Sequence, residues 1–464
     1  MDLFITIFFL ISVTFPVLHI YHCLPFFRDE DERTGANKGL KRWKIEHGYE
    51  QEEGISVLVP CFNEESIIET SIESMKTLAY SQFEVIYVND GSSDGTMNYL
   101  REMLDLKTSE LSPQGSLKHE NVKKVYQSQL YPNIYVIDKV NGGKADALNA
   151  GIEYSQKDLV VTLDADTILT ENALAAVNKA FKDKGVVAAG GMVHVLQTKT
   201  DNPLKRLSLK NANMLVRVQV LDFMKAFYIS KLSLVRFKAL AVISGAFGVF
   251  RKDILFKVGG YRNSIGEDID ITLRIQRFIA KKKQLKITFI ADAIGYTELP
   301  ETWKDLTKQR LRWQKAYVDC VIHFWAFFLK TLFTKPVSFF YIFETFLIGT
   351  IAAYFMTGLV TYNLITSSEN SILAYMFFYL FFLFLFGVLY DLVALRMNKH
   401  YGFRFQKGDG FRILGTILFD IIVYRFVAVY YVMYGSISYF FNKKWNKVSR
   451  TGRKYNQKKS ETAA

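Results

Sequence analysis

The chain has 464 residues, of which 50% are hydrophobic and 22% charged, with a formal net charge of +13. This length exceeds the roughly 100–200 residues of a typical domain, and the segregated apolar and charged stretches exclude both a uniform soluble protein and a pure membrane bundle. Three scattered cysteines exclude a cysteine metal site and favour a reducing compartment. Basic residues gather beside apolar segments, notably over residues 443–459, which favours anionic lipid over nucleic acid.

The N-terminal residues 3–27 are almost wholly apolar, which matches the ~20 residues that cross a bilayer as a helix. No basic cluster precedes this run and no small-residue cleavage site is evident, so a transmembrane helix over residues 1–27 is favoured over a signal peptide. A linker with charges of both signs follows over residues 28–53.

From residue 54 to about 297, short β-rich runs alternate with helical periods. This alternation predicts an α/β domain with a mostly parallel sheet flanked by helices. Residues 107–131 are polar and weakly periodic, and we expect them to form a partly helical surface insertion without chemistry.

The C-terminal part is apolar again: residues 337–365, 372–395 and 413–441 are each long enough to span a bilayer. Residues 317–333 mix charges and aromatics, which fits a helix in the interface plane, with a tilted membrane span as the alternative. The polar residues inside the spans are expected to face protein or a water-filled path, and simple helix pairing explains them equally well; they are Glu344, Asp391, Asp420 and Arg425. The predicted units are therefore residues 1–27, 28–53, a catalytic domain over 54–316, an interfacial helix over 317–335, a membrane region over 336–441 and a basic tail over 442–464.

Two predicted strands end in polar loops, one containing Phe62 and Glu64 and the other containing Asp90. Ligands of open α/β sheets bind beyond the carboxyl ends of the strands, so both loops would face one crevice. Asp90 is the candidate for a hydrogen bond to a base or ribose. Ordinary turn chemistry also explains its Asn-Asp-Gly context, and both interpretations stay open.

The stretch Asn141-Gly-Gly-Lys144 opens a predicted helix. Paired glycines and a lysine suit close approach to a diphosphate at a helix N-terminus. The glycine spacing excludes a Walker loop, which leaves an anion-binding turn or a plain helix start.

Two acidic motifs follow. The buried strand over residues 159–163 runs into Asp164-Ala-Asp166, and residues two apart at a strand end point to the same side. Two carboxylates beside a diphosphate make a site for Mg²⁺ or Mn²⁺. Asp268, at the start of a helical pattern, is either a helix N-cap or a base that accepts a proton from an acceptor hydroxyl.

The last motif, Gln309-Arg-Leu-Arg-Trp313, lies just before the C-terminal apolar region. The arginine fork matches phosphate oxygens, and tryptophan offers a face for a sugar ring. Interface anchoring at a membrane is the alternative.

In this order the motifs resemble the family 2 glycosyltransferases, whose catalytic domain has the GT-A (Rossmann-like) fold, over residues 54–313. The resemblance extends to the membrane-bound branch with poly-N-acetylglucosamine, hyaluronan, chitin and cellulose synthases, because Gln309 to Trp313 is similar to its Q-X-X-R-W motif. No F-X-V-T-X-K loop follows the motif, which counts against cellulose synthase. The region from Leu221 to Phe247 looks more like poly-N-acetylglucosamine-type synthases.

Residue chemistry and the resemblance together imply a role for each motif. Asp268 would be the catalytic base, in a motif whose usual threonine is replaced by Gly266, and Asp166 would hold the divalent cation. Asp90 would bind uridine, and Asp164 ribose and diphosphate. The nucleotide-sugar site would comprise Phe62, Glu64, Asp90, Lys144, Asp164, Gln309, Arg312 and Trp313, and the acceptor site Ser244, Gly245 and Trp313.

The resemblance implies an inverting transferase of the cell membrane, multi-pass, with a cytoplasmic catalytic domain. It would transfer sugar from a UDP-sugar, UDP-N-acetylglucosamine or another UDP-hexose, to a growing β-linked polysaccharide. A glycolipid synthase with a lipid acceptor is the alternative, since ceramide glucosyltransferases share a similar motif. Membrane lipids and accessory export or regulatory subunits are expected partners, and nucleic acid is not. Basic residues flank residues 413–441 on both sides, so we expect this segment to be re-entrant or interfacial.

Overall fold

The computed structural model describes residues 2–23, 52–200, 206–366 and 370–442. A ten-stranded sheet forms the centre, in the order β3-β4-β5-β2-β1-β6-β10-β8-β11-β7. Its strands are β1 (Ile55–Cys61), β2 (Phe83–Asp90), β3 (Leu106–Thr108), β4 (Val122–Ser128), β5 (Ile134–Lys139), β6 (Leu159–Leu163), β7 (Ile168–Leu169), β8 (Val186–Val195), β10 (Phe247–Arg251) and β11 (Lys286–Thr297). Two short strands, β9 (Arg206–Leu207) and β12 (Arg404–Phe405), pair separately.

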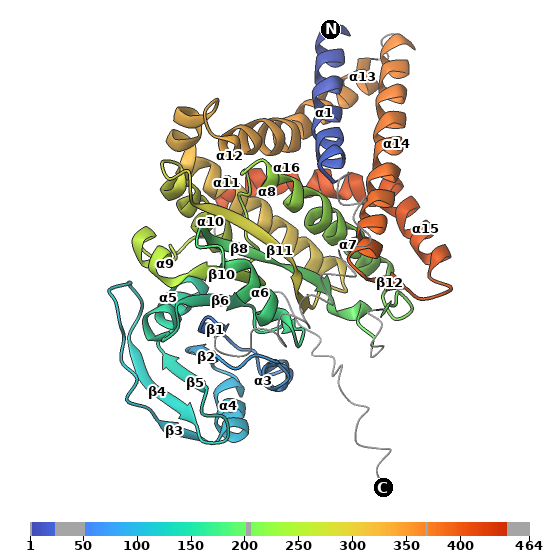
Figure 1. The fold of residues 1–464 in the computed structure, drawn as a ribbon. Helices are drawn as coiled ribbons and strands as arrows, with labels where there is room; N and C mark the ends of the chain where they lie inside the picture. The colour runs from blue at the N-terminus through green and yellow to red at the C-terminus, as the bar shows by residue number, and fades with distance from the viewer. Residues whose placement is uncertain (1, 24–51, 201–205, 367–369, 443–464) are drawn as a thin grey trace.

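Helices surround the sheet and continue beyond it (Figure 1). In the sheet domain they are α3 (Ile68–Lys76), α4 (Thr96–Leu104), α5 (Lys144–Tyr154), α6 (Ala173–Phe181), η3 (Leu196–Thr198), α7 (Met214–Met224), the π-helix η4 (Lys225–Lys231), α8 (Leu232–Arg236), α9 (Lys252–Val258) and α10 (Glu267–Ile279). The others are α1 (Asp2–Cys23), α11 (Trp303–Thr331), α12 (Pro336–Phe339), η5 (Phe340–Ile351), α13 (Ala352–Thr366), α14 (Asn370–His400), α15 (Gly410–Phe419), η6 (Asp420–Tyr424) and α16 (Arg425–Phe441).

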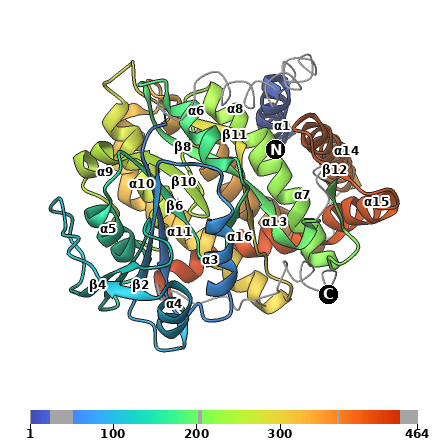
Figure 2. The same cartoon turned by 60° about the horizontal axis from the view of Figure 1, so that its bottom comes forward.

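The sheet is buried on both faces. Apolar residues of α5, α9 and α10 pack on one face and those of α3, α6 and α7 on the other, and Figure 2 shows the two groups on opposite sides of the strands. Burial from both sides explains why β6 reads as a continuous apolar run, all five of whose residues are buried. Because β1 pairs in parallel with both β2 and β6, the carboxyl ends of these three strands lie at one edge of the sheet.

The expectation of a mostly parallel sheet is only partly right. Parallel pairing joins β5, β2, β1 and β6, and also β8 and β11. By contrast, β10 runs antiparallel to both β6 and β8, because the chain enters it after the long α7–η4–α8 segment from the opposite end. The GT-A architecture is therefore a mixed α/β sheet.

We expected the segment from residue 107 to 131 to be partly helical, but it contains no helix. It contributes to the edge strand β3 and contains β4, which pairs antiparallel with β3 and β5. Along β4, Val125 and Ser128 are buried, whereas Lys123 and Lys124 are exposed. Strand β3 pairs only with residues 126–128 of β4, so the exposed lysines lie on the uncovered part of β4, where they disfavour pairing with another chain.

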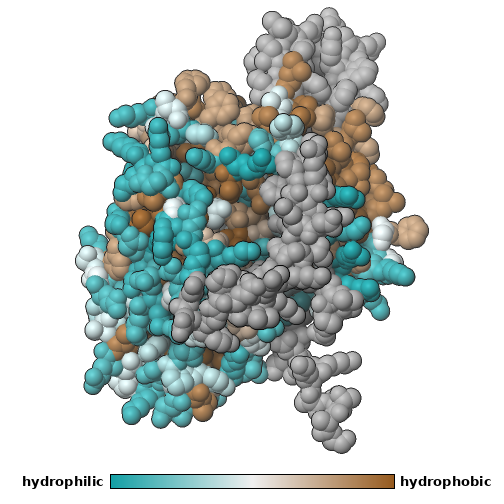
Figure 3. Space-filling view, in the orientation of Figure 1, coloured by the Kyte–Doolittle hydropathy of each residue, from teal (hydrophilic) through white to brown (hydrophobic). Residues whose placement is uncertain are grey.

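Two described segments are long and apolar enough to cross a membrane, Pro336–Phe355 and Gly410–Phe441. In Figure 1, α1 and α14 stand side by side above the sheet, whereas α16 runs crosswise beneath them along α11. Figure 3 shows hydrophilic side chains over the lower left of the molecule, and hydrophobic ones on the right, over α15 and the lower part of α14. The predicted spans at residues 337–365 and 413–441 overlap these segments, and those at 3–27 and 372–395 stay predictions.

The polar residues inside the apolar helices face protein. Glu344 Oε1 lies 2.7 Å from His19 Nε2, and Ser233 Oγ lies 2.8 Å from the other ring nitrogen of His19. Asp391 and Asp420 both pair with Lys225 of η4. Pairing between helices therefore accounts for the three carboxylates.

Helix α11 is continuous across the boundary expected at residue 316. It begins after Thr302, whose hydroxyl accepts a hydrogen bond from the Asp305 amide at 3.2 Å. One face, with Tyr317, Cys320 and Phe324, is buried, whereas Trp325 and Leu329 are exposed. The motif that ends in Trp313 thus stands on the same rigid helix as an exposed apolar surface.

Candidate active site

A cleft of about 900 Å³ opens at the carboxyl ends of β1, β2 and β6. This edge is where open α/β sheets bind ligands. The cleft wall contains the whole predicted set, Phe62, Glu64, Asp90, Lys144, Asp164, Asp166, Ser244, Gly245, Asp268, Gln309, Arg312 and Trp313. Fold topology thus brings all these residues together, while their chemical roles stay predictions.

Asp90 ends β2 and is only 2% exposed, because it engages the turn before α5. Lys139 Nζ lies 2.6 Å from its Oδ1, and the amides of Gly142 and Gly143 donate to its two oxygens at 3.0 and 2.8 Å. Gly143 adopts a φ of +92°, which residues with a Cβ rarely adopt. Asp90 therefore shapes this turn, a role that the sequence analysis missed because Lys139 lies in no motif.

Lys144 begins α5, which confirms that the Gly-Gly-Lys stretch opens a helix. Its Nζ lies 2.6 Å from Asp164 Oδ1 and 2.8 Å from Glu267 Oε1. Burial alone would lower the pKa of Lys144, but the two carboxylates outweigh it and hold that pKa well above its usual range. A fixed positive charge at a helix N-terminus suits a diphosphate.

Asp268 lies in the first turn of α10, whose N-cap is Gly266, so the N-cap interpretation of Asp268 is wrong. Its Oδ1 accepts a hydrogen bond from the Ile269 amide at 2.8 Å, and its Oδ2 accepts one from the Gly245 amide at 3.2 Å.

Burial, and then the adjacent charge of Glu267, raises the pKa of Asp268 to about 6. The positive charge of Lys144 acts in the opposite direction. A carboxylate with such a pKa takes up a proton far more readily than an ordinary aspartate and is still ionised at neutral pH. This environment suits a general base.

Lys231, at the end of η4, is a cleft residue that the sequence analysis missed. Its ammonium lies 3.9 Å from the centroid of the Phe227 ring. Burial lowers the pKa of Lys231 to about 8, and the charge of Asp268 opposes this shift. No sequence signal marks Lys231, because a single lysine in a helical stretch belongs to no motif.

Trp313 presents an open ring to the cleft, with 39% of the residue exposed. The Arg310 guanidinium lies 4.6 Å from its ring centroid. Behind the motif, Gln314 Nε2 donates to Ser436 Oγ of α16 at 3.0 Å, and the Thr307 and Tyr431 hydroxyls are 3.1 Å apart. Helix α16 thus supports the helix that carries Trp313.

The acidic pair Asp164 and Asp166 lines the cleft. The Thr297 hydroxyl donates to Asp166 Oδ2 at 3.3 Å. Among the described residues, no group of three or more His, Cys, Asp or Glu side chains could hold a metal ion. Mg²⁺ is commonly held by one or two carboxylates together with substrate phosphates, so this donor pair fits an ion that arrives with a diphosphate.

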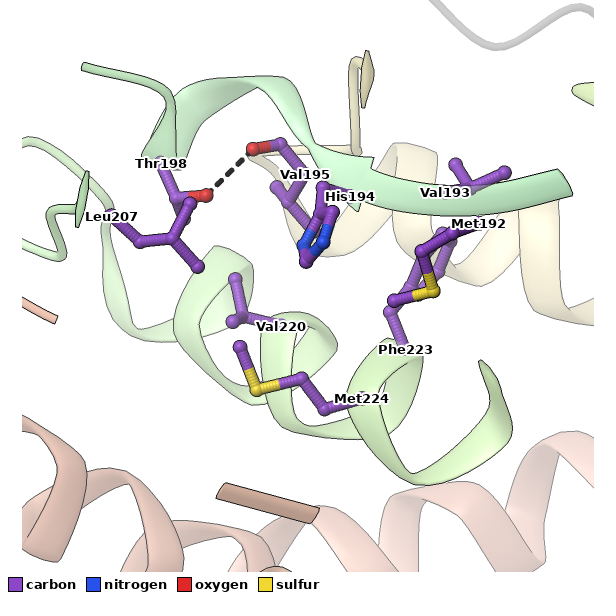
Figure 4. Close-up of a pocket in the computed structure, with 9 residues that line it drawn as sticks. All are labelled: Met192, Val193, His194, Val195, Thr198, Leu207, Val220, Phe223 and Met224. Carbon is purple, nitrogen blue, oxygen red and sulfur yellow. Dashed lines mark hydrogen bonds between the residues drawn. The ribbon is translucent and has the colours of Figure 1, made fainter. Parts of the chain in front are cut away.

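A second cavity, of about 10 Å³, lies between β8 and α7 and is shown in Figure 4. It is lined by Met192, His194, Val220 and Met224 among others. His194 is buried there, with its Nε2 3.1 Å from the Tyr228 hydroxyl. This space is about the size of one water molecule, so the large cleft is the candidate site.

Comparison with protein families gives two matches. The family described as Glycosyl transferase family 2 matches residues 56–259. The one described as Glycosyl transferase family group 2 matches residues 159–392, a little over half of the chain. Together the two matches include most of the sheet and the helix with Trp313.

Two similar proteins are poly-β-1,6-N-acetyl-D-glucosamine synthases. The one from Staphylococcus epidermidis is 30% identical over 297 residues, 64% of this chain and 61% of that protein. The one from Staphylococcus aureus strain COL is 27% identical, over 66% of this chain and 63% of that protein. This chain thus spans less than two thirds of either relative.

Among solved structures, a mannosyltransferase from Pyrobaculum calidifontis in complex with GDP-Man and Mn2+ is similar to this chain. The TM-score is 0.46 and the sequence identity is 16%, and the match covers 94% of this chain and 100% of that one. The family matches span the sheet, the acidic pair and the arginine-tryptophan motif that line the cleft. The chain belongs to glycosyl transferase family 2.

Proposed function

We propose that this protein is an inverting glycosyltransferase that transfers sugar from a UDP-sugar to a growing β-linked polysaccharide at the membrane. UDP-N-acetylglucosamine is the favoured donor, with other UDP-hexoses as alternatives. Family membership and the 30% identity to a poly-β-1,6-N-acetyl-D-glucosamine synthase support this proposal. The observation that carries it is the position of Asp268 in one cleft with Asp164 and Trp313.

A single displacement accounts for the reaction. The terminal sugar of the acceptor rests on Trp313, and its hydroxyl oxygen bonds to the anomeric carbon of the donor as the bond from that carbon to the diphosphate breaks. Asp268 accepts the hydroxyl proton, and UDP leaves with the electron pair. One in-line step inverts the anomeric configuration, and it requires only one base.

The donor diphosphate would lie between Lys144, at the N-terminus of α5, and Arg312, whose fork matches phosphate oxygens. Asp164 and Asp166 would hold Mg²⁺ or Mn²⁺. The bound ion would neutralise charge on the departing nucleotide. Lys144 already pairs with Asp164, so this carboxylate is fixed in place before the donor arrives.

The proposed location is the cell membrane, multi-pass, with the cleft on the cytoplasmic side where nucleotide sugars are made. The part of the chain after the sheet domain exposes large apolar side chains, among them Phe333, Phe411 and Phe441. Exposed apolar surface of this kind suits lipid. Accessory export or regulatory subunits are further proposed partners.

A glycolipid synthase is the second candidate. It is supported by the continuity of α11, because the helix that carries Trp313 ends in an exposed apolar surface with Trp325 and Leu329. A lipid acceptor could reach the cleft along this surface.

The deciding experiment uses purified protein in lipid vesicles with a panel of radiolabelled UDP-sugars. We expect one donor to give long product that a linkage-specific glycanase digests. A chloroform-soluble monoglycosyl lipid as the only product at every time point would replace the polymer proposal with the glycolipid one. Failure of every UDP-sugar to label a product would contradict both.

A further inference from the structure

One partly buried lysine, Lys225, pairs with carboxylates from three elements of the fold. Lys225 Nζ lies 3.5 Å from Asp222 Oδ1, 3.2 Å from Asp391 Oδ1 and 2.9 Å from Asp420 Oδ2. Asp222 belongs to α7, Asp391 to α14 and Asp420 to η6. We call these four residues the Lys225 cluster. It joins the wall of the cleft to two helices outside the sheet domain.

The cluster reaches Trp313 through one further residue. Arg310 Nη2 donates to Asp222 Oδ2 at 3.3 Å, and the same guanidinium lies over the Trp313 ring. Asp222, Arg310 and Trp313 line the cleft, whereas Asp391 and Asp420 do not. A chain of charged contacts therefore runs from α14 and η6 to the ring that faces the cleft.

Burial requires these charges to be paired. The Asp391 side chain is fully buried and Asp420 is 3% exposed, and a buried charge is stable only when it is paired. Arg425 lies against Gly387 of α14, one turn before Asp391, and adds a second positive charge nearby. Loss of Asp420 would consequently shift Lys225 towards Asp222 and Asp391. The stronger pull of Lys225 on Asp222 would weaken the contact between Asp222 and Arg310.

We infer that the Lys225 cluster sets the orientation of Trp313 towards the acceptor sugar, with Asp391 and Asp420 as positioning residues for acceptor binding. This inference rests on the proposed function. Asp222 is shared between Lys225 and Arg310, so movement of α14 or η6 reaches the Trp313 ring without a direct contact. The donor contacts proposed for Lys144 and Asp164 lie outside this chain of contacts.

The test replaces Asp420, which is remote from the cleft, with asparagine. Full-length protein in vesicles is assayed with UDP-N-acetylglucosamine and a β-linked N-acetylglucosamine tetrasaccharide as acceptor probe. For Asp420→Asn we expect an acceptor KM about tenfold higher and shorter products, with the donor KM within about twofold of wild type. Arg310→Lys, which keeps the charge near Asp222 but loses the flat guanidinium, should show the same acceptor defect.

Glu344→Gln is the matched control, because it removes the charge from the part-buried contact between α1 and η5 without touching the cluster. We expect it to lower the melting temperature and leave the acceptor KM unchanged. If Asp420→Asn proves unfolded, Arg310→Lys alone decides. A wild-type acceptor KM in Arg310→Lys, or donor and acceptor KM values that rise together in Asp420→Asn, would overturn the inference. A wild-type enzyme that extends no acceptor would overturn the proposed function with it.

Discussion

The ammonium of Lys144 lies 2.6 Å from the carboxylate of Asp164. It also lies 2.8 Å from Glu267, the residue before the proposed base. One lysine thus connects the part of the cleft that would hold the diphosphate with the part that would remove the acceptor proton. Its charge should affect both donor binding and the ionisation of Asp268.

Lys144→Met should therefore change two properties. Lys144 lowers the pKa of Asp268, so its loss raises that pKa, and the acid limb of the kcat/KM profile moves from about pH 6 to higher pH. Affinity for UDP should fall about tenfold, through the lost charge. A pH series and calorimetry measure the two effects. Lys76→Met, which removes an exposed pair with Glu73, is the control; an unmoved acid limb in Lys144→Met would count against Asp268 as the base.

Asp268→Asn should reduce sugar transfer about 10³-fold, because the amide keeps the shape and loses the base. UDP affinity should stay near wild type. Comparable loss of nucleotide affinity would instead assign Asp268 to donor binding.

The same substitution should stabilise the protein at alkaline pH. The pKa of Asp268 is about 6 in the folded protein against 3.8 for an ordinary aspartate. The folded state therefore prefers the protonated form, and stability is lost as pH rises through this interval. Asn removes that loss, so at pH 8 we expect a melting temperature about 2–4 °C higher, and no difference at pH 4. Asp253→Asn, at an exposed pair with Lys257, should show neither effect.

Metal dependence tests the acidic pair. Asp166→Ala should lower UDP affinity at least about tenfold in the presence of Mg²⁺ or Mn²⁺ and by much less in their absence. Turnover should be lost with it. Full activity of the wild-type enzyme in excess chelator would eliminate the metal proposal.

Trp313→Ala should abolish polymer but spare much of the slow hydrolysis of donor, since the phosphate contacts proposed for Arg312 remain. Trp313→Phe keeps an aromatic face and should retain part of the elongation. Trp303→Ala is a matched control, because Trp303 is exposed at the start of the same helix and does not line the cleft. Equal loss of hydrolysis and polymer in Trp313→Ala would place Trp313 in the donor site.

The end of α16 should be cytoplasmic. Lys315 of α11 donates to the Asn442 carbonyl at 2.8 Å, which places this end beside the motif with Trp313. Cys23, Cys61 and Cys320 are buried, so a new thiol at Asn442→Cys can be labelled selectively. We expect an impermeant maleimide to label it in inverted vesicles and not in intact cells. Labelling in intact cells would show that residues 413–441 span the membrane.

The sequence by itself determined that the predicted site residues share one cleft. Asp90 ends a strand and Asp164 follows one, and Lys144 begins a helix beside them. The alternation of strands and helices forces the ends of parallel strands to one edge of a sheet. Local order along the chain is therefore enough to predict that these residues meet.

Only the tertiary structure decided the partners of the buried charges. Lys139 and Lys225 lie in no motif, and Lys225 contacts Asp391 and Asp420, which are far away in the sequence. The antiparallel direction of β10 and the packing of α16 along α11 have the same origin. Such contacts depend on how complete elements pack, and neither residue spacing nor hydrophobic periodicity records that packing, because both describe only one element at a time.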